Sequence, residues 1–277
     1  MTRYMKDNSR QRRFLGLAAA LVAVGVVQVC GHASSAHGQQ EEQKRQSLEA
    51  PSPILPQGET AGLVRLDPED EIWLDLERKR LVINGAIAVT EGQLEMFACL
   101  KGTKEHESIV AARTKAYVAH AGLLALGAKP GGAVQFTPQY RPARGTPIEI
   151  NVYWRDARGR VREVRAQDWI RNVKTGKPME HTWVFGGSSF WVDEKTGQRF
   201  YMAEDGDFIC ISNFASAMLD LPVESSQSNA SLLFEAFSDK IPPRGTEVTI
   251  VLTPQLKGQD DAAEDYSGDG AAGGERG

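Results

Sequence analysis

A cysteine, a histidine and an aspartate are the residues of this sequence best suited to covalent catalysis. Cys99 precedes a glycine turn, and His106 follows that turn. Nucleophilic cysteine enzymes need a thiol and an imidazole in contact, because the imidazole takes the thiol proton. Either Asp168 or Asp207 is available to orient the imidazole. These residues predict a hydrolase or a transferase, with a purely local hydrogen-bonding role for His106 as the competing interpretation.

The loop after Cys99 is a candidate ligand-binding segment. It consists of Lys101, Gly102, Thr103 and Lys104. Backbone N–H groups at the start of a helix, together with two ammonium groups, hold a phosphate or a carboxylate. The glycine spacing does not match a nucleotide-binding loop. The loop therefore predicts either a site for an anionic ligand or an ordinary solvated turn.

Two cysteines, Cys99 and Cys210, lie in short apolar stretches that are typical of strands. Three states of this pair remain open. They are two buried free thiols, a disulfide in an exported protein, and a reactive pair that binds a metal or is redox-active. No recognised metal-ligand spacing links the cysteines to the histidines. The sequence therefore predicts no metal site and no cofactor.

Three pairs of similar stretches occur in the same order along the chain. The matching stretches are 97–100 with 208–211, 124–126 with 219–221, and 142–152 with 242–252. Repeats of this kind indicate an internal duplication, and a duplicated unit packs against its twin. The sequence therefore predicts two pseudo-symmetric halves, over about residues 69–165 and 166–256, with Cys99 and Cys210 at equivalent positions.

Short apolar stretches, many of them alternating with a period of two, predict strands over most of the folded part. The expected strands cover 72–77, 81–83, 86–89, 93–100, 134–137, 147–155, 161–165, 183–185, 190–192, 199–202, 208–211, 232–237 and 246–253. We expect a long helix over 105–126, with Glu105 and Glu107 at its positive end, and a short helix over 214–221. The predicted fold class is α+β, mostly antiparallel β with a few helices.

The first residues have the order of a secretory signal. Basic residues precede an apolar run from Phe14 to Val29, and small residues follow before Gln39. We expect residues 1–38 to be a signal peptide, which predicts an exported protein in the periplasm or outside the cell. A retained N-terminal membrane anchor is the alternative.

Three segments follow the expected signal. Residues 39–68 are proline-rich and predict a disordered tether, 69–256 form the folded domain, and 257–277 form a disordered acidic tail. Removing residues 1–38 takes away five basic residues and one acidic residue, which changes the net charge from −4 to −8. That balance argues against a nucleic-acid partner, and no later segment is apolar enough for a membrane span. The partner or ligand remains unknown.

Four stretches resemble the YdjY-domain family of exported bacterial proteins. These are 99–108, 166–170, 183–188 and 206–213, and the resemblance covers roughly residues 70–254. The family is largely uncharacterised, so the resemblance implies membership rather than an activity. A ferredoxin-like label on some members implies an iron–sulfur cluster, which needs about four thiolates. Only Cys99 and Cys210 remain after the expected signal, so no cluster is carried over.

The leading functional hypothesis is an exported, non-enzymatic domain that binds a ligand, a partner or cell-envelope material. The alternative is an envelope enzyme, a hydrolase or transferase that uses Cys99 and His106. Large aromatic residues at Trp169, Trp183 and Trp191 fit a core, and they also fit a carbohydrate or peptide cleft. A buried Cys99 favours the binding domain, and an exposed sulfur beside an imidazole favours the enzyme.

Overall fold

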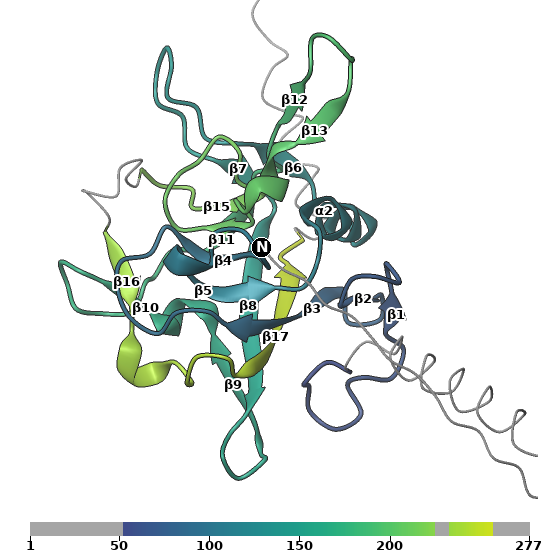
Figure 1. Ribbon diagram of the computed structural model, residues 1–277, viewed down its shortest axis with the longest axis vertical. Coiled ribbons are helices and arrows are strands. Elements are labelled where there is room, and N and C mark those ends of the chain that lie inside the picture. The colour runs from purple at the N-terminus through teal and green to yellow at the C-terminus, as the bar shows by residue number, and fades with distance from the viewer. Residues whose placement is uncertain (1–51, 225–232, 257–277) are drawn as a thin grey trace, which may run out of the picture. The chain divides into compact units, whose positions relative to one another are not determined.

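The computed structural model describes residues 52–224 and 233–256, and its main feature is a closed barrel (Figure 1). Eight strands form the ring in the order β3, β17, β8, β11, β15, β14, β4 and β5, and β5 pairs back with β3. Their bounds are β3 Arg80–Ile87, β4 Met96–Leu100, β5 Ser108–Ala112, β8 Pro147–Arg155, β11 Trp183–Phe185, β14 Ile209–Cys210, β15 Leu219–Asp220 and β17 Glu247–Pro254. Neighbours are antiparallel except in the pairs β4–β5 and β14–β15.

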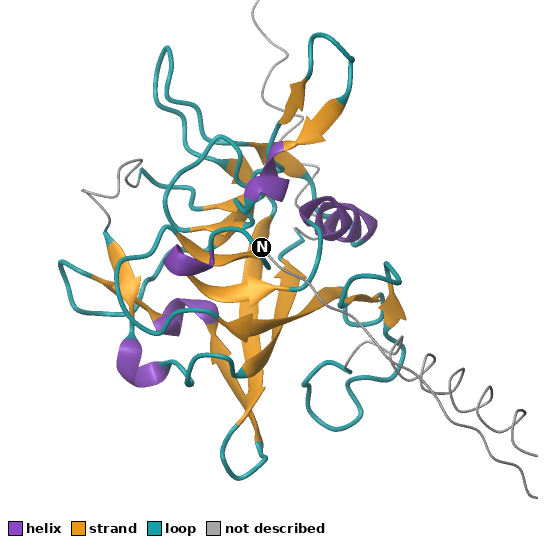
Figure 2. Ribbon diagram, viewed as in Figure 1, coloured by secondary structure: helices purple, strands orange, loops and turns teal. Residues whose placement is uncertain are grey.

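Further strands extend or flank the ring (Figure 2). Strands β1 (Val64–Arg65) and β2 (Ile72–Asp75) continue the sheet from β3, and β9 (Val161–Arg165) pairs with β8. Three separate ladders join β6 (Pro130–Gly132) to β7 (Arg144–Gly145), β10 (Ile170–Asn172) to β16 (Phe234–Ala236), and β12 (Phe190–Val192) to β13 (Arg199–Tyr201). Short 3-10 turns η1 (Glu105–Glu107), η2 (Ala166–Trp169), η3 (Met202–Asp205) and η5 (Ser238–Lys240) connect these elements.

Alternating side chains explain why the long strands bury one face. In β8, Ile148, Ile150 and Val152 are buried, whereas Glu149 and Asn151 between them are not. Successive side chains of a strand point to opposite faces, so the apolar set turns inward as a group. Strand β17 pairs with β8 from Val248 to Pro254, and both strands contribute to one large core inside the ring.

The predicted fold class is wrong, because the protein is mostly β. Among the described residues, α2 (Ala116–Ala125) is the sole α-helix. The expected helix over 105–126 divides into η1, the buried strand β5 and then α2, and the expected helix over 214–221 contains strand β15. Strand β5 forms because its backbone pairs with both β4 and β3, and this tertiary pairing overrides local helix propensity.

The structure gives no evidence of two duplicated halves. Strands from 69–165 and from 166–256 pair with each other in one ring and share one core, so the two ranges do not pack as separate units. The matched stretches are neighbours, since β4 pairs with β14 and β8 pairs with β17. Helix α2 has no α-helical counterpart among the described residues of 166–256.

Residues 52–68, which the sequence assigned to the tether, pack on the barrel. Leu55 is buried in a small cluster with Val82 and Val251, and the Ile54 N–H donates to Thr249 Oγ1 at 2.7 Å. The expected signal peptide and acidic tail, and residues 225–232, lie outside the described residues. Within the described part, none of the helices has the length and apolarity needed to span a membrane.

Candidate functional site

Three of the four stretches that carry the family resemblance meet at one place. Strand β4 pairs with β14, so that Met96 lies opposite Cys210. The indole N–H of Trp183 donates to the carbonyl oxygen of Cys210 at 2.7 Å. Gly206 packs so closely on the loop after β4 that a Cβ there would lie 2.6 Å from Thr103 Oγ1. Segments about one hundred residues apart therefore build a single site.

An ion pair lies at the centre of this site. Lys104 Nζ is 2.7 Å from Asp207 Oδ1, and the Ser216 hydroxyl donates to the other oxygen of the same carboxylate. Burial alone would lower the pKa of Lys104, but the bond to Asp207 and the nearby negative charges outweigh it and raise the pKa. The ammonium also lies 5.1 Å from the centre of the Phe214 ring. Lys104 is therefore a fixed cation and not a general base.

A pair of carboxyl groups lies beside the ion pair. Burial raises the pKa of Glu95, and the charge and hydrogen bond of Glu107 raise it further. The backbone holds Glu95 in place, because its carbonyl oxygen accepts the N–H groups of Ile211 and Ser212 at 2.8 and 2.9 Å. Two neighbouring carboxyl groups thus lie close to the Lys104 ammonium group, whose charge lowers the pKa of Glu95 less than the other causes raise it.

Both cysteines belong to the site, and both are closed off from solvent. Cys99 and Cys210 are free thiols with no exposed surface, packed with Met96 and Ala217. Burial raises the pKa of Cys99 more than the Ser108 and Thr103 hydroxyls lower it, and burial raises the pKa of Cys210 far above its usual range. Because the thiolate is the reactive form, neither sulfur is prepared for nucleophilic or redox chemistry. The two cysteines are thus free thiols, whereas the sequence also allowed a disulfide between them.

The three residues of the expected catalytic set do not meet. The His106 side chain is 79% exposed, and its Nε2 lies 3.8 Å from Glu107 Oε2. Asp168 Oδ1 pairs with Arg165 at 3.1 Å on the surface. Asp207, the other residue considered for orienting the imidazole, bonds to Lys104 instead. With Cys99 fully buried, the structure provides no contact between thiol, imidazole and carboxylate.

The expected ligand loop satisfies its own polar groups. Gly102 has the positive φ of +84° that favours glycine, and its N–H donates to Glu105 Oε1 at 2.7 Å. Thr103 Oγ1 donates to the Leu100 carbonyl at 2.6 Å, and Lys104 is committed to Asp207. Lys101 is exposed. A carboxylate of the chain itself thus occupies the place of an external anion. Within the described residues, no group of three histidine, cysteine, aspartate or glutamate residues is arranged to hold a metal ion.

Sequence analysis missed a buried contact between His120 and Tyr201. His120 Nδ1 lies 2.8 Å from the Tyr201 hydroxyl, which in turn lies 3.2 Å from the Gly187 carbonyl oxygen. Burial lowers the pKa of His120, so the imidazole is neutral at physiological pH. These residues join α2, β13 and the turn after β11, and no sequence spacing signals the contact. Their effect is to anchor the base of the β12–β13 hairpin.

The β12–β13 hairpin carries exposed aromatic side chains. Phe190 is 53% exposed, Trp191 52% and Phe200 41%. Trp191 and Phe200 face each other across the two strands, with ring centres 5.3 Å apart. A hollow of about 370 Å³ adjoins them, and it is lined by Trp191, Phe200, Tyr201, Met202, Glu204 and Asp205. Figure 1 shows the hairpin extending away from the ring. Trp169 and Trp183, in contrast, are buried.

The domain is a closed barrel in which segments far apart in the sequence meet in one cluster of charged groups and buried thiols. The family model for the YdjY domain matches residues 72–253. The chain therefore belongs to the YdjY domain family. None of the curated proteins and none of the solved structures matched this chain.

Proposed function

We propose that this chain is an exported, non-enzymatic binding domain that attaches to glycan-bearing cell-envelope material through the β12–β13 hairpin. The observation that carries the proposal is the exposure of Phe190, Trp191 and Phe200 beside a hollow that also contains carboxylates. The burial of both thiols supports a binding role over a cysteine enzyme. Export rests on the signal-like order of residues 1–38.

Exposed aromatic rings need a partner to offset their contact with water. Contiguous exposed apolar surface on a soluble domain marks an interaction site or a ligand groove. A pyranose ring suits this hairpin, because its C–H face stacks on Trp191 or Phe200 and its hydroxyl groups donate to acceptors. Asp205 at the edge of the hollow is an exposed acceptor. Glu204 already accepts the Tyr117 N–H at 2.8 Å through Oε1, which fixes it in place.

The turn of the hairpin argues against insertion into a lipid bilayer. Residues 193–198 join the strands, and Asp193 accepts the backbone N–H groups of Lys195 and Thr196 at 2.8 and 2.9 Å. Asp193, Glu194 and Lys195 place three charged groups at the tip. A tip-first insertion would bury these charges at a high free-energy cost. A polar, glycan-like surface is compatible with the charged tip and with the aromatic strands behind it.

A sedimentation assay tests the proposal. The full chain is mixed with purified peptidoglycan sacculi, and the bound fraction is measured over a range of sacculus concentrations. We expect saturable binding that falls about tenfold in a Trp191→Ala, Phe200→Ala double variant, because each stacked ring contributes about 0.5–1.5 kcal/mol. Leu76→Ala is the matched control, since Leu76 is equally apolar and 60% exposed but lies outside the hairpin.

Two results would refute the glycan proposal. One is the absence of saturable binding to sacculi by the unmodified chain. The other is an equal loss in the Leu76→Ala control, which would indicate non-specific adsorption of apolar surface. Sedimentation with neutral phospholipid vesicles in place of sacculi, or dimerisation that disappears in the double variant, would assign the hairpin to a lipid surface or to a second copy instead.

A further inference from the structure

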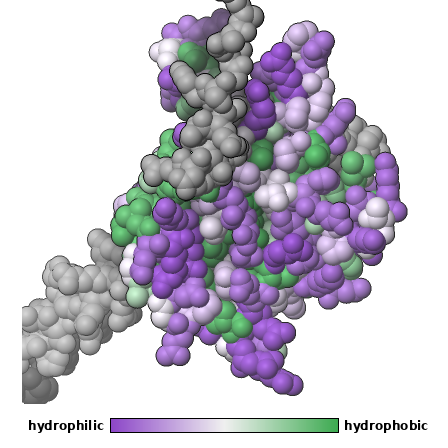
Figure 3. Space-filling model, turned by 180° about the vertical axis from the view of Figure 1, so that it is seen from behind, coloured by the Kyte–Doolittle hydropathy of each residue, from purple (hydrophilic) through white to green (hydrophobic). Residues whose placement is uncertain are grey.

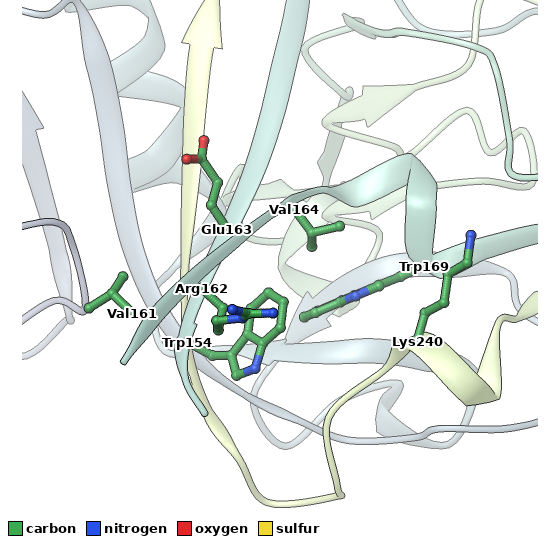
Figure 4. Close-up of a pocket in the computed structure, with 7 residues that line it drawn as sticks. All are labelled: Trp154, Val161, Arg162, Glu163, Val164, Trp169 and Lys240. Carbon is green, nitrogen blue, oxygen red and sulfur yellow. The ribbon is translucent and has the colours of Figure 1, made fainter. Parts of the chain in front are cut away.

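We infer a second binding site, a cationic groove over Trp154 that takes a phosphate-bearing ligand with a flat ring. Two hollows of about 440 Å³ each adjoin one another there and share Trp154 and Lys240. The first is lined by Trp154, Val161, Arg162, Glu163, Val164, Trp169 and Lys240 (Figure 4). The second continues past Arg155 to the Pro242–Pro243 turn.

The groove is basic in an acidic protein. Residues 155–165 cover the end of β8, the turn and β9 of the β8–β9 hairpin. They contain five arginines and two carboxylates, although the whole chain has a net charge of −4. Three cationic side chains line the two hollows: Arg155, Arg162 and Lys240. Glu163 and Asp156 also line the hollows, so three cations face two carboxylates there. An excess of one sign of charge on low-dielectric walls concentrates ligands of the opposite sign. The local excess of positive charge therefore selects an anion.

The contacts of these three cations with their own neighbours leave them available to a ligand. Asp156 is committed to Arg160, which approaches one of its oxygens at 3.0 Å, whereas Arg162 Nε is 4.0 Å from that oxygen. Glu163 turns to the other face, where it accepts the Tyr153 hydroxyl at 2.7 Å. Within residues 52–224 and 233–256, neither Arg155 nor Lys240 forms an ion pair. Arg155 donates to the Gly159 carbonyl oxygen, and Lys240 Nζ lies 4.0 Å from the centre of the Phe237 ring.

The wall of the groove offers a ring a place to stack. Trp154 is half-buried and packs against the fully buried Trp169, with ring centres 5.3 Å apart. Packing against Trp169 therefore holds the Trp154 side chain in place, and part of its indole faces the groove. Trp154 and Arg162 are directly opposite each other in the β8–β9 ladder. Figure 4 shows the guanidinium of Arg162 beside the indole of Trp154, with Lys240 next to Trp169.

The number and type of cations favour phosphate over carboxylate. Arginine presents a planar fork that bonds two oxygens of a phosphate at once, and lysine adds a compact charge. A single carboxylate carries one negative charge and two acceptor oxygens, which would leave part of this groove unpaired. A phosphate ester carries more charge and three acceptor oxygens. A flat group attached to that ester would lie on Trp154.

The test uses phenyl phosphate, the simplest molecule with a flat ring and a phosphate ester. The full chain is titrated by calorimetry at low ionic strength, and we expect saturable binding. Arg162→Gln and Lys240→Gln should each weaken binding about tenfold, since each removes one charge-assisted contact. Arg158→Gln is the matched control, because Arg158 lies in the same hairpin but does not line either hollow.

Four results would overturn this inference. They are no saturable binding of phenyl phosphate, an equal loss in Arg158→Gln, equal affinity for inorganic phosphate, which removes the role of Trp154, and equal affinity for benzoate, which removes the preference for phosphate. The inference is independent of the glycan proposal. The Trp191→Ala, Phe200→Ala variant should keep its affinity for phenyl phosphate, so failure at one site leaves the other intact.

Discussion

Replacing Asp220 by asparagine should change how the stability of the barrel depends on pH. Asp220 lies in β15 with no exposed surface. Its Oδ1 accepts the side-chain N–H of Asn213 at 3.0 Å and the backbone N–H of Leu221 at 2.8 Å. Burial is the main cause that raises the pKa of this carboxyl group from 3.8 to about 7. The folded chain therefore binds this proton more tightly than the unfolded chain does.

The direction and size of the effect follow from that difference. The stabilisation from the bound proton is complete below pH 3.8 and is lost as the pH rises to about 7. A shift of about 3 units at 1.36 kcal/mol per unit corresponds to about 4 kcal/mol of unfolding free energy. An asparagine side chain at this position does not ionise, and it keeps the Oδ1 acceptor. We expect the Asp220→Asn variant to match the parent near pH 4 and to be more stable by up to about 4 kcal/mol at pH 8.

Urea unfolding followed by tryptophan fluorescence measures this effect at several pH values between 4 and 8. The relevant quantity is the difference in unfolding free energy between variant and parent, because pH effects common to both cancel. Asp239→Asn is the control, since Asp239 is exposed in η5. A difference that stays constant with pH, or a variant less stable than the parent at pH 8, would refute the assignment of a buried, protonated Asp220.

Two further predictions concern the candidate site. Cys99 and Cys210 should resist alkylation in the native chain and react fully in urea, because both are buried and burial raises both thiol pKa values. Labelling is mapped by mass spectrometry, and rapid labelling of either cysteine in the native chain would show that the site is open. Lys104→Met should lower the unfolding free energy by about 2 kcal/mol, since it leaves the largely buried Asp207 carboxylate without its partner. If the exposed Lys101→Met variant loses as much, the ion pair contributes nothing to stability.

Local patterns in the sequence predicted the strands better than they predicted the helices. The expected strands over 147–155 and 161–165 are confirmed, and so is the turn between them, where the Asp156 N–H donates to the Arg160 carbonyl at 2.9 Å. A hairpin is encoded by alternation and turn residues close together in the chain. The helix predicted over 105–126 is wrong at β5, because that strand is fixed by partners outside its own segment.

The candidate site was only partly accessible to sequence reasoning. The sequence singled out Cys99, Lys104 and Cys210, and the structure places them in one region. Their arrangement depends on the β4–β14 pairing, which no local pattern specifies. His106 illustrates the limit, because its short separation from Cys99 did not reveal that the thiol lies in a fully buried strand and the imidazole in an exposed turn. On the face of the molecule shown in Figure 3, hydrophobic residues are scattered among hydrophilic ones.

Strand β9 has consequences for how copies of this protein behave at high concentration. It pairs with β8 on one side, and among the described residues no strand covers its other side. Unpaired edges invite strand addition by another molecule, and charged side chains discourage it. Arg162, Glu163 and Arg165 place three charges in this five-residue strand. Arg162, which we assign to ligand recognition, thus also discourages aggregation, and neutral variants of β9 should be less soluble than the parent.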